Sequence, residues 1–178
     1  MMVVVCNIHP PFLILLGLIG CFLMSGICAF FGHRDCPCTP EIENNLKQAI
    51  LQLIDEGYDE FWVGSQGNFD WLVHLVLKQI KQEAPHIREC IILASDPDKY
   101  SSTRQESLSE QYDDIICPEE IFEGPARFAI TRRNKYMVEN CDTIICYIEY
   151  EKGGAYDTIK TAKKLNKRII NTTNYNYN

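Results

Sequence analysis

Residues 143–158 of the chain read TIICYIEYEKGGAYDT. Thr143 to Ile148 is a short continuous apolar run, which is typical of a strand buried on both faces of a sheet. Polar residues and the pair Gly153-Gly154 follow, and the pair opens a predicted helix from about Ala155 to Leu165. A buried strand that passes through a glycine turn into a helix is the repeating unit of α/β folds.

The same unit recurs upstream and downstream. Further strands are predicted at 27–31, 60–63, 89–94, 113–117 and 168–170, and helices at 40–56, 69–80 and 125–137. Thr39 and Pro40 are typical of a helix start. Residues 95–112 are polar, and a mobile loop or lid is expected there. The sequence therefore predicts a Rossmann-like α/β fold: a three-layer sandwich with a mostly parallel sheet and helices on both faces.

The N-terminal segment allows two interpretations. Residues 12–31 carry no charge and are long enough to span a bilayer, as an anchor or a signal segment. However, no Lys or Arg precedes the run, Pro10 and Pro11 open it, and its end is needed as the first strand. We therefore expect residues 1–23 to be a hydrophobic extension before a start at Met24, a single domain over 24–171 and a frayed tail over 172–178.

The composition narrows the class of protein. With 46% apolar and 23% charged residues, the chain can build its own core, so its nine cysteines are expected to be reduced rather than a disulfide framework. This favours a cytoplasmic location, with membrane anchoring through residues 12–31 as the alternative. The net charge of −7 argues against nucleic acid as a partner, because phosphate contacts need a basic face.

Four unusual loops leave the carboxyl ends of predicted strands, where open parallel sheets bind their ligands. Glycines there permit close backbone approach, and the following helix starts offer N–H groups to a phosphate. The glycines could equally be flexible turns. The predicted ligand-binding residues are Gly32, His33, Arg34, Gly64, Ser65, Gln66, Gly67, Asn68, Asp70, Arg132, Asn134, Gly153, Gly154 and Thr158.

The residue types in these loops suggest roles. Arg34, Arg132 and Arg133 suit bidentate contact with phosphate. Asp70 could accept from a ribose hydroxyl or could simply complement a helix dipole. His33, Cys36 and Cys38 are possible zinc ligands, but a structural zinc site needs a fourth ligand and none stands out. We therefore expect a small nucleotide-like partner, with no metal and no cofactor.

The strings CAFFGHRDCP, FWVGSQGNFD, PEEIFEGPARFAITRRN and KGGAYDTIKTA, in this order, resemble the SLOG superfamily. The resemblance is to its branch common in Firmicutes, related to YpsA-like and lonely-guy (LOG) proteins. It covers about Ser25 to Asn171. It implies a Rossmann-like protein that binds nucleotides or nucleotide-derived ligands and often forms homodimers.

Lonely-guy enzymes cleave the N-glycosidic bond of nucleoside 5′-monophosphates. The resemblance matches their Arg to Arg133, nine residues before Asp142, and their glycine pair to Gly153-Gly154. Their catalytic Glu has no counterpart, so Asp157 or Glu123 would have to replace it. The leading hypothesis is therefore a binding protein, acting as a sensor or accessory factor. The alternatives are a phosphoribohydrolase that uses Arg133 and Asp157, and an interaction protein.

Overall fold

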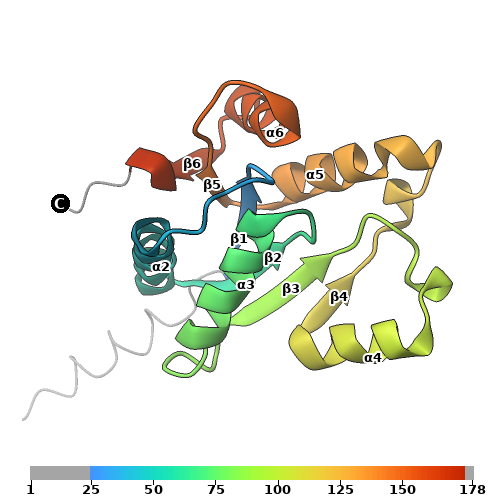
Figure 1. The fold of residues 1–178 in the computed structure, drawn as a ribbon, viewed down its shortest axis with the longest axis horizontal. Helices are drawn as coiled ribbons and strands as arrows, with labels where there is room; N and C mark the ends of the chain where they lie inside the picture. The colour runs from blue at the N-terminus through green and yellow to red at the C-terminus, as the bar shows by residue number, and fades with distance from the viewer. Residues whose placement is uncertain (1–24, 175–178) are drawn as a thin grey trace, which may run out of the picture.

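A computed structural model describes residues 25–174 (Figure 1). Strands and helices alternate along this part of the chain. In order, they are β1 (Gly26–Gly32), α2 (Pro40–Asp55), β2 (Tyr58–Val63), α3 (Asn68–Ile80), β3 (Arg88–Ile92), α4 (Ser102–Gln111), β4 (Asp114–Ile116), α5 (Ala129–Asn140), β5 (Thr143–Tyr147), α6 (Gly153–Lys164) and β6 (Arg168–Asn171). The single-turn 3₁₀ helices are η1 (Pro97–Lys99), η2 (Glu119–Ile121), η3 (Ala126–Phe128) and η4 (Thr172–Asn174).

The strands form one six-stranded sheet in the order β4-β3-β2-β1-β5-β6. Every neighbouring pair is parallel, which confirms the predicted fold class. The chain builds the sheet outward from β1 to β4 and then returns to the other side of β1 for β5 and β6. The crossovers therefore diverge between β1 and β5, and this switch point is where open α/β sheets bind ligands.

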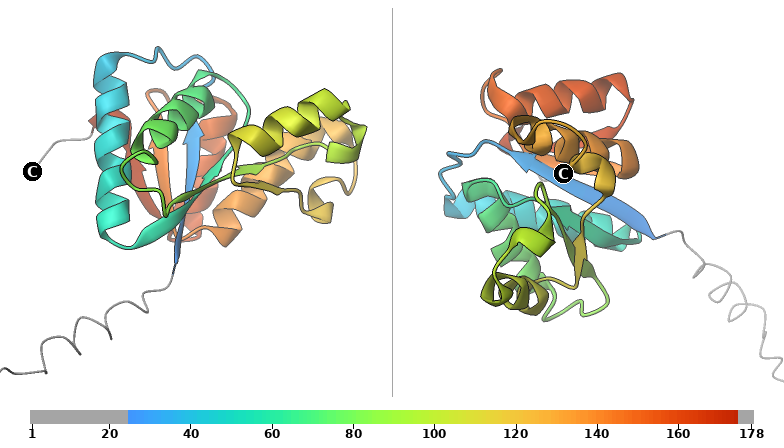
Figure 2. Two further views of the ribbon diagram at one scale, coloured as in Figure 1. Left: turned by 90° about the horizontal axis from the view of Figure 1, so that it is seen from below. Right: turned by 90° about the vertical axis from the view of Figure 1, so that its right-hand side faces the viewer.

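Successive side chains of β1 point to opposite faces and divide the core into two clusters. Cys28 and Phe30 pack with residues of α2 and α3, whereas Ala29 and Phe31 pack with residues of α5 and α6. The two helix layers on either side of the sheet are visible in Figure 2. Because β1 is buried on both faces, it reads as an uninterrupted apolar run in the sequence.

The prediction of a mobile loop over residues 95–112 is wrong, because most of these residues are helical. Ser101 caps α4, and its Oγ accepts a hydrogen bond from the Arg104 backbone N at 3.4 Å. The Arg104 guanidinium lies 3.9 Å from the centre of the Tyr100 ring. No residue of α4 is buried, so the apolar spacing that reveals a helix in sequence is absent. Local capping and ring contacts mark this helix instead.

The helix predicted from Pro125 begins later, at Ala129, and continues to Asn140 rather than Met137. Pro125 precedes the 3₁₀ turn η3 instead. Arg132 accounts for the path of this segment: its Nε donates to Ile121 O at 2.8 Å and its Nη1 to Pro125 O at 3.3 Å. The side chain of Arg132 is thereby committed to the preceding loop.

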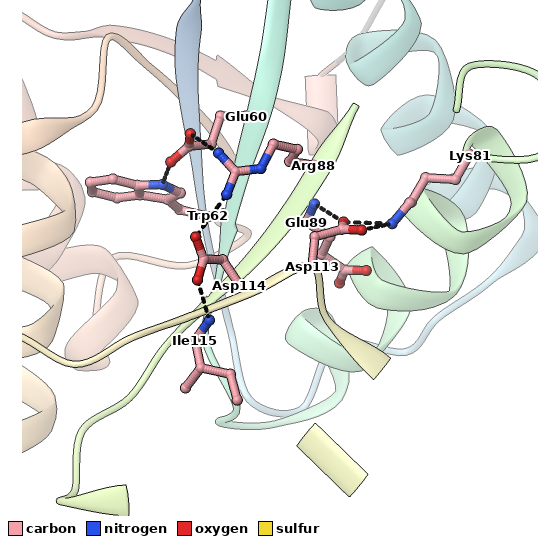
Figure 3. A network of polar contacts seen from close by, with 8 residues as sticks. All are labelled: Glu60, Trp62, Lys81, Arg88, Glu89, Asp113, Asp114 and Ile115. Carbon is pink, nitrogen blue, oxygen red and sulfur yellow. Dashed lines mark hydrogen bonds and ion pairs between the residues drawn. The ribbon is translucent and has the colours of Figure 1, made fainter. Parts of the chain in front are cut away.

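Charged groups tie the amino ends of β2, β3 and β4 together (Figure 3). Arg88 donates to Asp114 at 2.7 Å and to Glu60 at 3.4 Å, and Glu60 accepts from the Trp62 indole at 2.6 Å. Lys81 of the segment after α3 reaches the Asp113 carboxylate. Because the strands are parallel, this network stands at the opposite edge of the sheet from the strand carboxyl ends.

The predicted domain start at Met24, and the part of the uncharged run before residue 25, lie outside the described residues. Between residues 25 and 174, no helix combines the length and apolarity needed to cross a membrane. The first residue of the predicted frayed tail, Thr172, is well packed. Thr172 is buried, its Oγ1 donates to Cys146 O at 3.1 Å, and its carbonyl accepts from Asn45 at 3.1 Å.

Candidate functional site

A cavity of about 640 Å³ opens at the carboxyl end of β1, beside the switch point of the sheet. Four segments that are distant in sequence enclose it: the end of β1 with its loop, the start of α3, the first half of α5, and the start of α6 with the loop before it. We call it the strand-end cavity. The predicted residues that line it are Gly32, His33, Arg34, Gln66, Asp70, Arg133, Asn134, Gly153 and Gly154.

Arg133 is the most unusual residue of this cavity, because its side chain is only 4% exposed. Its Nε and Nη2 donate to Asn134 Oδ1 at 3.1 and 2.8 Å. Its Nη1 is buried without a hydrogen-bond partner. Burial lowers the pKa of Arg133, and the nearby Asp70 charge opposes that shift. A guanidinium stays protonated in proteins, so the cavity wall holds a positive charge with an unsatisfied donor.

Asp70 lies beside this guanidinium. Its Oδ2 accepts from the Gln66 backbone N at 2.7 Å. Burial raises the pKa of Asp70, while the bond from Gln66 and the charge of Arg133 act in the other direction. Gly64 makes the pair fit: a Cβ at this position would lie 2.6 Å from Asp70 Oδ2 and 2.8 Å from Arg133 Nη1. The absence of a side chain at Gly64 thus leaves room for the carboxylate and the guanidinium side by side.

An aromatic stack closes another wall of the cavity. The His33 ring, 4% exposed, lies parallel to the Tyr150 ring with centres 3.7 Å apart. His33 Nε2 accepts a hydrogen bond from Tyr150 N at 3.4 Å. The Tyr150 hydroxyl donates to Asp35 at 2.8 Å, and this bond raises the pKa of Tyr150 and lowers that of Asp35. The stack fixes the loop between β5 and α6 over the end of β1.

The start of α6 faces the cavity with free backbone donors. Gly153 has φ +89°, a conformation that favours glycine, and no side chain caps the helix. A Cβ on Gly153 or Gly154 would meet nothing within 4 Å, so the turn is open on its outer side. Uncapped N–H groups at a helix start attract anions. The start of α6 and Arg133 therefore present positive charge to the same space.

Asn134 connects Arg133 to the first turn of α6. Its Oδ1 holds Arg133, and its Nδ2 donates to Thr158 Oγ1 at 3.1 Å. Thr158 Oγ1 in turn donates to Gly154 O at 2.8 Å. Thr158 does not line the strand-end cavity, so its place is behind the wall, between α5 and the first turn of α6. Its contacts fix the orientation of the wall rather than reach the space inside.

Other predicted residues lie outside the cavity lining. Gly67, with φ +110°, packs against the Arg34 backbone, and Asn68 N donates to Arg34 O at 2.9 Å. These two residues therefore support the loop after β1. Gly64 leaves the space that the Asp70 and Arg133 side chains occupy. Ser65 is exposed at the loop surface and does not line the cavity.

The remaining predicted side chains are also placed elsewhere. Arg132 faces the 118–128 segment, as described above. Asp157 is largely exposed and pairs with Lys160 at 2.7 Å, in a groove between α5 and α6. Glu123 lines neither space. The acids proposed to replace a catalytic Glu therefore do not share the cavity of Arg133.

Sequence reasoning missed several residues of the cavity. Asp35, Tyr150 and Lys152 line it, together with Ile130 of α5. Asp35 and Tyr150 follow the ends of β1 and β5 within a few residues, so their distance from a strand end was a usable signal. Ile130 carried no such signal, because its place depends on where α5 begins.

The sheet order and the position of the cavity at the switch point define a Rossmann-type α/β protein with a cavity at the strand ends. The YpsA family model, described as the YspA SLOG family, matches residues 28–177. The chain therefore belongs to this SLOG family, which confirms the resemblance drawn from the motifs.

Comparison with known proteins gives related sequences and folds. The UPF0398 protein BH1768 of Halalkalibacterium halodurans is 29% identical over 133 residues, which are 69% of this chain and 68% of that protein. DNA processing protein A of Streptococcus pneumoniae has a similar fold, with a TM-score of 0.60 and 14% identity over 82% of this chain. The chain spans about half of that protein, 49%.

A second structure with this fold reports the single-stranded DNA binding mode of DNA processing protein A from Helicobacter pylori. Its TM-score is 0.59, with 16% identity, and the match covers 84% of this chain and 70% of that one. The exclusion of nucleic acid as a partner is wrong in the light of this finding, because a protein of this fold binds single-stranded DNA. Family and fold together fit a nucleotide-related role.

The distribution of charge along the chain explains why the net charge led to a wrong prediction about nucleic acid. Residues 125–178 hold ten Lys or Arg and five Asp or Glu, whereas residues 1–124 hold seven and nineteen. The part of the chain that forms α5 and α6 is therefore net positive, by +5, within an acidic protein. A sum over the whole chain conceals such an asymmetry, and phosphate contacts depend on the local charge.

Proposed function

We propose that the protein binds a nucleotide or a nucleotide-derived small molecule through its phosphate in the strand-end cavity. The observation that carries the proposal is the Nη1 of Arg133, buried in the cavity wall without a partner. An unpaired buried donor on a charged group is costly unless a ligand completes it. A phosphate oxygen would complete it with a charge-assisted hydrogen bond.

The other groups suit the rest of such a ligand. The N–H groups at the start of α6 and the exposed Arg34 would share the phosphate charge. Asp70 accepts from Gln66 N through Oδ2, so its Oδ1 is available to a ribose hydroxyl. Asn134 would orient Arg133 rather than touch the ligand, because its oxygen and nitrogen already bond Arg133 and Thr158.

The position of the acids favours binding over glycosidic hydrolysis. A hydrolase needs a carboxylate within reach of the attacking water or the leaving base. Asp157 pairs with Lys160 outside the strand-end cavity, and Glu123 is exposed on the loop before α5. The two carboxylates that do line the cavity, Asp35 and Asp70, already accept hydrogen bonds from the Tyr150 hydroxyl and from Gln66 N. Binding without turnover, as in a sensor or an accessory factor, is therefore the function that the site supports best.

A second candidate function is binding of single-stranded nucleic acid. Two observations favour it: the fold shared with a single-stranded DNA-binding protein, and the positive charge of the part that forms α5 and α6. Single-strand binding combines basic grooves with a strong dependence on salt. The strand-end cavity could then receive the phosphorylated end of a strand.

Isothermal titration calorimetry with AMP, adenosine and inorganic phosphate tests the leading proposal. We expect AMP to bind, adenosine to bind at least about tenfold more weakly, and Arg133→Met to remove this difference. No binding of AMP or any other nucleoside monophosphate would overturn the proposal. Chromatography of the same samples should show no free adenine. Adenine released by the wild type and not by Arg133→Met would assign the hydrolase function instead.

A further inference from the structure

A second hollow adjoins the strand-end cavity. It has a volume of about 290 Å³ and lies between α5 and α6. Ile130, Asn134 and Gly154 line both spaces, so the two meet along a shared wall. We call the second space the α5–α6 groove. It leads away from the positive wall formed by Arg133 and the start of α6, over the outer surface of the two helices.

The walls of the α5–α6 groove differ from those of the first cavity. Thr131 and Thr161 line it from opposite helices, the Thr161 hydroxyl donates to Asp157 O at 3.2 Å, and the exposed Ile130 supplies an apolar surface. Lys135 and Asp157 are exposed at its sides, one charge of each sign. Hydroxyl, apolar and charged groups together suit a sugar and a base, which present hydrogen-bonding edges and a flat apolar face.

The size of the first cavity makes the groove unnecessary for a single nucleotide. Ligand sites for small molecules measure about 300–1,000 Å³, and the strand-end cavity at about 640 Å³ already lies in this range. A ligand with one nucleotide unit would leave the groove unoccupied. The charges that line the groove balance, but the two helices that form it hold six Lys or Arg and two Asp or Glu, which suits a ligand that carries a second phosphate or a linking phosphate.

Resting on the proposed function, we infer that the ligand has two nucleotide units joined through phosphate. The first unit lies in the strand-end cavity with its phosphate on Arg133, and the second lies in the α5–α6 groove between Thr131 and Thr161. The shared chemistry is a linked pair of nucleosides, with either a 5′–5′ pyrophosphate or a 3′–5′ phosphodiester linkage.

Calorimetric titration with three probes tests the inference: AMP, the 5′-phosphorylated dinucleotide pApA, and NAD⁺. We expect one of the two-unit probes to bind about tenfold or more tightly than AMP, because the second contact becomes intramolecular. Which of the two binds more tightly identifies the linkage. Equal affinity for all three would overturn the inference while leaving the proposed function intact, and a failure of AMP to bind would overturn the function itself.

Variants that fill the groove test its position. Thr161→Trp should remove the gain of the two-unit probe and leave the affinity for AMP unchanged. Thr131→Trp fills the groove from α5 and should likewise remove the gain without changing the affinity for AMP. With two such variants, a folding defect in one still leaves the other as a test. Thr103→Trp on the exposed surface of α4 is the matched control and should change neither affinity. If the two-unit probe still binds more tightly than AMP in both groove variants, the inference is contradicted. It is also contradicted if affinity continues to rise from pApA to a single strand of ten nucleotides.

Discussion

Replacing Arg133 by methionine should separate stability from ligand binding in this protein. Methionine matches the length and flexibility of the arginine stem and fills irregular space. The change removes a buried charge whose Nη1 has no partner, together with the two hydrogen bonds to Asn134 Oδ1. These two losses act on the free energy of unfolding in opposite directions.

Each loss can be given a size. An unsatisfied buried donor costs about 1–3 kcal/mol, and a hydrogen bond of a charged group contributes about 1.5–3 kcal/mol. Asn134 is half-buried, so water can replace the guanidinium at its oxygen. The free energy of unfolding should therefore change by no more than about 1–2 kcal/mol in either direction. Phosphate affinity should fall by about 2–5 kcal/mol, the cost of truncating one partner of a buried charge pair.

Urea unfolding and AMP titration of the same samples measure both quantities. At about 1.4 kcal/mol per tenfold, AMP should bind about 30-fold to several thousand-fold more weakly. Arg132→Met is the matched control: Arg132 also has a buried nitrogen without a partner, Nη2, but its bonds go to Ile121 O and Pro125 O and it does not line the cavity, so AMP affinity should remain. A large loss of stability in Arg133→Met with unchanged AMP affinity would refute the reasoning, because Arg133 would then be structural.

Three further predictions concern the same region and the core. Gly64→Ala should lower stability by about 1–3 kcal/mol in thermal melts through overpacking, whereas Gly154→Ala should not, since a Cβ there meets nothing within 4 Å; equal effects would contradict this. Burial raises the pKa of Asp70, so its stabilising contribution is full below the ordinary pKa and is lost as pH rises through the folded value. Asp70→Asn should therefore gain stability relative to wild type as pH rises from about 4, and a constant difference across pH would exclude the effect. Burial raises the pKa of Cys90 and Cys146 to about 12, so peptide mapping should find both unalkylated by iodoacetamide at pH 8 until urea unfolds the chain; labelling of the native protein would contradict the fold.

The fold could be predicted because its central strands, β1 and β5, are buried on both faces. β1 and β5 read as continuous apolar runs, and each is followed by a polar or glycine-containing turn. The parallel sheet then places all strand carboxyl ends at one edge, so the loops of the site could be chosen before their geometry was known. α4 escaped prediction because it buries no residue, and the periodicity on which helix prediction depends was missing.

The side chains of the site were harder to predict, because helix phase decides which of them face the cavity. Arg132 and Arg133 are adjacent, yet one holds a loop and the other lines the cavity. Neighbouring residues on a helix point about 100° apart, and the start of α5 was placed four residues early, at Pro125 rather than Ala129. The exclusion of nucleic acid failed for a related reason, since the net charge carries no information about position.

The central claim is that Arg133 Nη1 is completed by a ligand phosphate in the strand-end cavity. A crystal structure of the protein soaked with AMP tests it most directly. The account predicts a phosphate oxygen about 2.7–2.9 Å from Arg133 Nη1, with other oxygens facing the backbone N–H groups at the start of α6. AMP bound elsewhere, with Arg133 Nη1 still unpaired, would contradict it.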